Sequence, residues 1–185
     1  MKIDITMNIT PEMLQDAYEN KNKALEGHIG THFDVMDKNF PLEYTQREAV
    51  VFDVSSVKDR DIDVCDIDVD KLGAGMFVAF YTGFSAEEKY GTYRYFKEHP
   101  QLSHTLIDLL LEKKISIIGV DFAGVRRGAE HTPADQKCAD CGVFVIENLV
   151  DLNLLLNSPN TVIDTYPVKC THISGLPCRV VAETF

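Results

Sequence analysis

Three side chains that commonly bind metal ions stand close together between His28 and Asp34, where the chain reads HIGTHFD. In a regular helix His28 and His32 would share a face, but Asp34 would point roughly 240° away from His28. In a straight strand His28 and Asp34 would lie about 20 Å apart, whereas bonds to one metal ion are only about 2.0–2.2 Å long. The three residues can therefore bind one ion only if the chain turns tightly between them.

Two glycines make such a turn possible. Gly27 and Gly30 carry no side chain and can adopt backbone angles that other residues avoid. A second interpretation stays open at this point, because an H-x-x-x-H pair with a nearby aspartate also arises by chance in surface loops. The rest of the chain has to distinguish a metal site from a chance cluster.

Length and charge limit the class of protein. The chain has 185 residues, of which 45% are hydrophobic, and we expect one well-buried domain over residues 1–185. With 18 basic and 29 acidic residues the net charge is −11, which argues against nucleic acid and anionic membrane surfaces as partners. A small-molecule substrate or a protein partner stays open.

The sequence predicts a cytoplasmic protein. Its opening, MKIDITMNIT, contains no apolar run of signal-peptide length, and no segment has about 18 consecutive apolar residues. Five cysteines, an odd number, fit reduced thiols better than a disulfide framework. Cys138 and Cys141 form a C-x-x-C pair without a second pair to complete a zinc site. Because it lies in a predicted connection, a structural or incidental role is favoured over a redox one.

Hydrophobic periodicity predicts strands alternating with helices. The segment Ile3–Ile9 alternates like a strand, and Thr10 followed by Pro11 is typical of a helix start, so we expect a helix over Met13–Leu25. Ser103 is placed to cap a second helix with a leucine stripe. Apolar runs indicate further strands at Ala49–Val54, Met76–Tyr81, Ile115–Asp121 and Val143–Ile146. The pattern predicts an α/β fold with a mixed sheet and flanking helices.

Acidic residues close two of the predicted strands. Asp121 ends one apolar run and Glu147 follows the next. The carboxyl ends of strands are positions where α/β folds place ligand-binding groups, although each residue could equally cap a helix or face solvent.

The histidine stretch resembles the H-x-G-T-H-x-D motif of the cyclase-like metal-dependent hydrolases, a family that includes bacterial kynurenine formamidases and isatin hydrolases. Further segments resemble the family in the same order along nearly the whole chain. IDIT (3–6) resembles the family's first strand, FYTGF (80–84) resembles L-x-x-T-G-W/F, and IGVD (118–121) resembles V-G-I-D. IENL (146–149) resembles I-E-x-L, and LPCR (176–179) resembles S-P-x-R. Six matches in register favour a metal site over a chance cluster.

The resemblance implies a compact single-domain fold of the swivelling β/α/β type, assembled as a homodimer or homotetramer. It also implies one or two divalent ions per subunit, zinc or manganese. Carried over position by position, His28, His32, Asp34 and Glu147 would be ligands, and Asp34 could bridge two ions. The implied reaction is hydrolysis of a small amide, cyclic amide or ester by a metal-activated water, in an arylformamidase-like enzyme acting on C–N bonds other than peptide bonds.

Two positions depart from the family pattern. Lys38 stands where the motif continues to a proton-shuttling histidine; as a protonated group it could donate a proton or orient a carbonyl, and the neighbouring Asp37 could act in its place. Asp135 stands twelve residues before Glu147, where the family has a histidine ligand, and His131 lies four residues earlier. The register favours Asp135 as the fifth ligand, whereas His131 would reach the metal only through a local insertion.

These departures leave a second hypothesis, a family member that has lost catalysis and acts as a metal- or ligand-binding protein. Two imidazoles with three carboxylates form a harder site than is usual for zinc, which favours manganese or another oxygen-tolerant ion. The spacing of His99, His104 and His172 does not tie them to the site, and we expect them on the surface or in the core.

Overall fold

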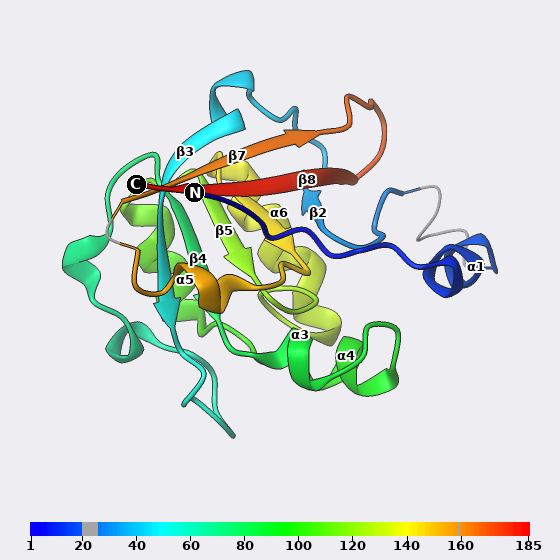
Figure 1. The fold of residues 1–185 in the computed structure, drawn as a ribbon, viewed down its shortest axis with the longest axis horizontal. Coiled ribbons are helices and arrows are strands. Elements are labelled where there is room, and N and C mark those ends of the chain that lie inside the picture. The colour runs from blue at the N-terminus through cyan, green and yellow to red at the C-terminus, as the bar shows by residue number, and fades with distance from the viewer. Residues whose placement is uncertain (20–25, 159) are drawn as a thin grey trace.

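A mixed β-sheet that closes on itself dominates the computed structural model, which describes residues 1–19, 26–158 and 160–185 (Figure 1). The strands pair in the order β1-β8-β2-β6-β5-β4-β3-β7, and a further pairing of β7 with β8 closes the barrel. Their bounds are β1 Lys2–Asp4, β2 His32–Asp34, β3 Gln46–Asp53, β4 Phe77–Tyr81, β5 Ile117–Val120, β6 Phe144–Glu147, β7 Thr161–Pro167 and β8 Gly175–Thr184. The predicted α/β class with a mixed sheet and flanking helices is confirmed.

Helices flank this barrel. In Figure 1, α5 and α6 lie behind the parallel strands, α3 and α4 stand at one end of them, and α1 extends to one side. No described helix is long and apolar enough to cross a membrane. The α-helices are α1 Pro11–Glu19, α3 Phe84–Glu87, α4 Tyr93–Lys97, α5 His104–Glu112 and α6 His131–Asp140, and short 3-10 turns cover Leu42–Thr45, Val64–Asp66, Val69–Lys71, Gly128–Glu130 and Leu152–Leu155.

The parallel strands are joined by crossover helices. β3, β4, β5 and β6 run parallel to one another, and α5 and α6 connect β4 to β5 and β5 to β6. As predicted, α5 is capped by Ser103, whose hydroxyl oxygen accepts a hydrogen bond from Leu106 N at 3.0 Å. Leu106, Ile107 and Leu110 are the buried residues of α5, and they belong to the hydrophobic cluster that covers β4, β5 and β6.

The first predicted strand is shorter than expected. β1 ends at Asp4, whose carboxylate accepts a hydrogen bond from Thr6 N at 3.1 Å and bends the chain. Thr6 then forms a bridge with Leu149, beyond the end of β6, and only its hydroxyl stays bonded to the backbone of Val180 in β8. The strand expected to continue through Ile9 is therefore wrong in length, because the backbone of Thr6 no longer pairs with β8.

The first predicted helix begins where the sequence indicated. Pro11 is its first residue, and the Thr10 hydroxyl accepts a hydrogen bond from Met13 N at 3.3 Å. The helix is described as far as Glu19, and the end of the prediction, residues 20–25, lies outside the described residues.

The connection predicted around the cysteine pair is wrong, because this segment forms α6. Its sequence, HTPADQKCAD, has no apolar stripe, and its buried face consists of Ala134, Asp135, Cys138 and Ala139. Small and polar residues of this kind give no helical hydrophobic pattern. Cys138 and Cys141 are free thiols, and burial raises the pKa of Cys138, which disfavours a redox role.

Two hydrophobic clusters meet at the sheet. Along β4, Phe77 and Ala79 belong to the cluster enclosed by the barrel, while Val78 and Phe80 belong to the cluster beneath the helices. Successive residues of a strand point to opposite faces. Phe33 in the middle of β2 likewise points into the barrel, so its neighbours His32 and Asp34 point the other way, toward α6.

His99 lies in the helical layer, in the core as expected. Its side chain is 1% exposed, its ring stacks on Phe122 at 5.5 Å between centroids, and its Nδ1 lies 2.7 Å from the Pro100 carbonyl oxygen. Burial lowers the pKa of His99 to about 4. The folded protein therefore holds this imidazole neutral.

This buried imidazole predicts a loss of stability in mild acid. Below about pH 6.5 the unfolded chain protonates His99, whereas the folded chain keeps this imidazole neutral down to about pH 4. The free energy of unfolding therefore decreases as the pH is lowered across that interval. For His99→Phe, the drop in the free energy of unfolding between pH 7.5 and pH 5 should be smaller by about 2 kcal/mol. Urea denaturation at both pH values measures it, with His104→Phe as an exposed control. Equal drops in the His99 variant and the parent would contradict the prediction.

Candidate metal centre

The histidine stretch turns sharply before it enters the sheet. Gly27 has φ +78° and Gly30 has φ +58°, the left-handed conformations that the spacing of the ligands requires. Gly27 also packs directly on Gly175 at the start of β8, since a Cβ on Gly27 would lie 2.8 Å from the Gly175 carbonyl carbon. The tight turn predicted from the sequence is confirmed, and it folds His28 back toward β2.

Strand geometry brings three of the candidate residues together. His32 and Asp34 are two positions apart on β2 and share a face. β2 is inserted between β6 and β8, and His32 is paired in register with Glu147. The Nε2 atom of His32 lies 3.6 Å from Glu147 Oε2 and 3.7 Å from Asp34 Oδ1.

Helix α6 adds two more. His131 and Asp135 are four residues apart at its start and therefore lie on one face. His131 Nε2 is 3.5 Å from Asp135 Oδ2 and 3.8 Å from Glu147 Oε1. The helix thus faces the carboxyl end of β6 with an imidazole and a carboxylate.

The donor atoms fall into two groups, and within each group all of them lie within 4.8 Å of one another. The first ligand set is His28, His32 and Asp34, and the second ligand set is Asp34, His131, Asp135 and Glu147. His28 Nδ1 lies 3.1 Å from both Asp34 Oδ1 and His32 Nε2. Ligands of one tetrahedral ion are about 3.4 Å apart when the bonds are about 2.1 Å long, so this spacing suits metal ions.

Two imidazoles are oriented by hydrogen bonds on their outer nitrogens. His32 Nδ1 lies 2.9 Å from the Gly30 carbonyl oxygen, and His131 Nδ1 lies 3.1 Å from the Arg126 carbonyl oxygen. Because a carbonyl only accepts, Nδ1 carries the proton in both rings and Nε2 is free to bind a cation. Metal-binding histidines typically have such an outer partner.

A cavity of about 1050 Å³ lies between the loop after β2 and the loop that joins β7 to β8. Ser174 and Glu26 line it, and the Ser174 hydroxyl lies 2.9 Å from His28 Nε2. Its other walls are largely apolar, with Met36, Phe40, Ile173 and Leu176, and also carry Asp37 and Lys38. None of the residues of the two ligand sets lines the cavity, and Ser174 connects it to His28.

Three carboxylates are buried together in the two ligand sets. Asp34, Asp135 and Glu147 are 2%, 2% and 4% exposed. Burial opposes ionisation of Asp34, but His32 and His28 outweigh it and hold its pKa below the usual value. Burial and the charge of Asp34 raise the pKa values of Asp135 and Glu147. One oxygen of each carboxylate has no hydrogen-bond partner in the described part of the chain.

The five predicted ligands come together in space, and a sixth residue joins them. His131 needs no local insertion to reach the others, because it lies one helical turn before Asp135 on the same face of α6. We had expected only one of these two residues near the site. Whether each of them ligates a metal stays a prediction.

The predicted catalytic pair lies apart from the ligand sets. Lys38 Nζ pairs with Asp37 Oδ1 at 3.0 Å and with Asp140 Oδ1 at 2.7 Å, and Asp37 also accepts a hydrogen bond from Gln136. Within the described ranges, no hydrogen bond or ion pair joins either side chain to the ligand sets. The pair connects the loop after β2 to the end of α6.

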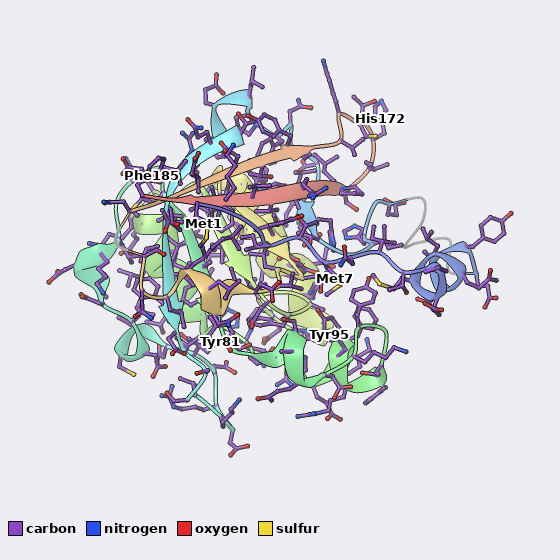
Figure 2. The ribbon with its side chains drawn as sticks, in the orientation of Figure 1. Met1, Met7, Tyr81, Tyr95, His172 and Phe185 are labelled. Atoms are coloured by element: carbon purple, nitrogen blue, oxygen red, sulfur yellow. The ribbon has the colours of Figure 1, made fainter. Side chains whose placement is uncertain are left out.

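Asp121, the other acidic residue at a strand end, does not reach the donor groups. Its carboxylate accepts hydrogen bonds from the backbone of Thr82 and Gly83 and from the Thr82 hydroxyl. It therefore fixes the Thr-Gly turn after β4. His172 lies on the loop between β7 and β8 at the edge of the molecule, as Figure 2 shows.

A family model covers more than half of the sequence. The Cyclase model, described as "Putative cyclase", matches residues 3–126. The chain belongs to the Cyclase family. The matched segment contains the first ligand set and ends before His131, so most of the second set lies beyond it. A search of the curated proteins finds no match.

Solved structures extend the likeness to almost the whole Cyclase chain. Isatin hydrolase A from Ralstonia solanacearum has a TM-score of 0.77 and 20% identity, covering 98% of this chain and 91% of its own. Isatin hydrolase A from Labrenzia aggregata, bound to benzyl benzoate, has a TM-score of 0.75 and 20% identity, covering 98% and 93%. A potential metal-dependent hydrolase with cyclase activity has a TM-score of 0.74 and 24% identity, covering 98% and 96%. At these identities the comparison establishes the fold.

Gly124 offers a test of the second ligand set. It has φ +104°, and a Cβ there would overlap the His131 ring and lie 3.0 Å from Glu147 Oε1. Gly124→Ala should push the imidazole off the Arg126 carbonyl and weaken metal binding at this set by roughly 10- to 100-fold. Calorimetric titration of metal-free protein with Mn²⁺ measures the change.

Gly91→Ala is the matched control. Gly91 has φ +97°, close to that of Gly124, but a Cβ there would meet nothing within 4 Å. Backbone strain should then be similar while metal affinity stays near that of the parent. Equal weakening in both variants would show that strain, and not displacement of His131, is responsible.

Proposed function

We propose that this Cyclase family member is a metal-dependent hydrolase that cleaves a small amide, cyclic amide or ester. The observation that carries the proposal is the pair of ligand sets joined through Asp34. The names of the similar structures, isatin hydrolase and metal-dependent hydrolase, support this reaction class. Because isatin is a cyclic amide, they also favour a C–N bond other than a peptide bond. The cavity that Ser174 connects to His28 would hold the small-molecule substrate.

The residues fit divalent cations. Adjacent buried carboxylates repel one another when ionised, and an unpartnered buried oxygen is costly. Asp34 Oδ2, Asp135 Oδ1 and Glu147 Oε1 are such oxygens. Cations at this position would provide the missing partners and balance the charge.

We propose two ions per subunit, one in each ligand set, with Asp34 shared. The first set has two imidazoles and one carboxylate, which suits zinc or manganese. The second has one imidazole and three carboxylates, and this oxygen-rich composition favours manganese. The family resemblance further supports a homodimer or homotetramer, and the cytoplasmic location expected from the sequence stays a prediction.

The bound ions would lower the pKa of a coordinated water to about 7 and polarise a carbonyl group. The chain itself keeps the donors rigid and controls access. His32 and Glu147 are 3% and 4% exposed, so solvent scarcely reaches these two side chains. The His28 and His131 side chains are 29% and 33% exposed, which leaves an approach from solvent.

Lys38 would act as a fixed positive charge. Its ion pairs with Asp140 and Asp37 raise the pKa of Lys38, so it stays protonated at neutral pH. It can orient a carbonyl or an anionic product but cannot accept a proton. Hydrogen bonds from Gln136 and Lys38 lower the pKa of Asp37, which makes Asp37 a weak base.

The same environment favours a second candidate function, a metal- or ligand-binding protein without catalysis. The family's proton-shuttling histidine is replaced by a lysine that its neighbours keep protonated. If a base at this position is essential, the ligand sets would bind metal without turnover.

Replacing His32 tests both functions. His32→Ala removes a buried donor from the first set and the partner of Glu147, so the purified protein should lose at least one equivalent of metal and at least about 100-fold in hydrolysis. Elemental analysis of tag-free protein, with a panel of formamides, lactams and lactones, measures the two effects. His104→Ala, on an exposed histidine, is the control. Metal without turnover would favour the binding protein, and absence of metal in the parent would exclude both functions.

Single replacements also count the ions. His28→Ala and His131→Ala should each remove one equivalent of Mn²⁺, because each residue belongs to only one ligand set. Asp34→Asn should remove both equivalents, since it weakens the shared donor. Native mass spectrometry gives the stoichiometry. A parent that holds a single ion, lost equally in all three variants, would rule out the two-ion arrangement.

A further inference from the structure

Asn148 joins the end of β6 to the turn that carries His32. Its side chain is buried, and its Nδ2 donates a hydrogen bond to the Gly30 carbonyl oxygen at 2.9 Å. The same oxygen lies 2.9 Å from His32 Nδ1. The two contacts meet on one atom, so the Gly30 carbonyl connects a buried amide to the first ligand set.

The orientation of this amide is determined by its neighbours. The two ends of an asparagine side chain have almost the same shape, and only their hydrogen bonds distinguish them. Because the Gly30 carbonyl oxygen only accepts, Nδ2 must face it, and Oδ1 then accepts from the Tyr95 hydroxyl at 2.8 Å. Tyr95 is itself fully buried on α4 and packs against the Phe96 ring. The amide of Asn148 is thus held at both ends.

The Gly30 peptide needs such an anchor. Gly30 has φ +58°, and glycine has more conformational freedom than any other residue. A carbonyl group on so mobile a residue orients an imidazole only if another contact fixes the carbonyl itself. The amide of Asn148 provides that contact. His131 gives an internal comparison, because its Nδ1 lies instead 3.1 Å from the Arg126 carbonyl oxygen.

The backbone of Asn148 is held by separate contacts. Its N–H donates to the Phe122 carbonyl oxygen at 3.1 Å, and its carbonyl oxygen accepts from the Thr31 hydroxyl at 2.7 Å. Its φ is +59°, which glycine adopts without strain. Asn148→Gly would therefore remove the amide and leave the backbone in place, together with the preceding Glu147 of the second ligand set.

We propose that Asn148 is a positioning residue that acts through the Gly30 carbonyl to hold the His32 ring in the orientation that binds a metal ion. The consequence for metal binding rests on the proposed function, whereas the orientation of the ring is a property of the metal-free protein as well. Loss of a direct outer partner typically costs 10- to 100-fold in metal affinity. Because Asn148 acts through one intervening carbonyl, its loss should cost about 10-fold.

Metal titration tests the effect on binding. In calorimetric titrations of metal-free protein with Mn²⁺, Asn148→Gly should weaken one of two binding events by about 10-fold and leave the other unchanged. The weakened event should be the one that His28→Ala removes. Asp151→Gly is the matched control and should bind both ions like the parent, since Asp151 also follows β6 with positive φ, +54°, but is exposed. Equal weakening of both events by Asn148→Gly would indicate a general structural effect and overturn the proposal.

Ring dynamics test the orientation without metal. In protein with ¹³C-labelled histidine, relaxation of the ring C–H groups should show a lower order parameter for His32 in Asn148→Gly than in the parent. The His131 ring should be unchanged. Tyr95→Phe takes the donor away from Asn148 Oδ1 and should lower the order of the His32 ring by a smaller amount.

An unchanged order parameter of the His32 ring in Asn148→Gly would refute the proposal. If Asn148→Gly does not fold, Tyr95→Phe decides alone by the same criterion, because it keeps the buried ring and removes only a hydroxyl. A parent that binds no metal would end the proposed function, while ring dynamics would still judge the role of Asn148.

Discussion

The burial of Asp34 between two groups of donors is the constraint on which the rest of the structure depends. A carboxylate that is 2% exposed needs balancing charge or hydrogen bonds, and His28 and His32 provide part of that balance. β2 has only three residues, yet it is hydrogen-bonded to β6 on one side and β8 on the other. The closed sheet therefore fixes this short strand more firmly than its own length would allow, and the position of Asp34 is fixed with it.

Unusual backbone conformations gather around this strand. Gly27, Gly30 and Gly124 have positive φ, and so does Asn148, directly after Glu147. Asn148 Nδ2 donates at 2.9 Å to the Gly30 carbonyl oxygen, the same atom that holds His32. The Tyr95 hydroxyl donates to Asn148 Oδ1 at 2.8 Å from the buried face of α4. Strained positions persist where surrounding contacts determine them, and here the contacts of Gly30 and Asn148 also orient His32.

Local signals in the sequence were sufficient for part of this site. The glycines beside His28 predicted the turn, and apolar runs predicted the four parallel strands, because both features depend on neighbouring residues. Helix α6 was missed, since its buried face is built of alanines, Asp135 and Cys138. One signal could have found it: two adjacent parallel strands need a crossover, and only the segment before Val143 is long enough to supply it. The barrel closure by β7 and β8 depends on pairings between distant residues, which no local pattern specifies.

The position of α6 changes the meaning of the departures from the family pattern. Spacing alone indicates that Asp135 replaces a histidine ligand of the family with a carboxylate. In the structure His131 supplies an imidazole from the preceding turn, so Asp135 adds a carboxylate to a donor set that still contains a histidine. The remaining departure is Lys38, which stands where the family has its proton-shuttling histidine. Its loop is bound to the end of α6 through the ion pair with Asp140. Under the proposed arrangement of two ions, Lys38 is the departure to which a loss of catalysis would be assigned, because the imidazoles of His32 and His131 are oriented by backbone carbonyl oxygens.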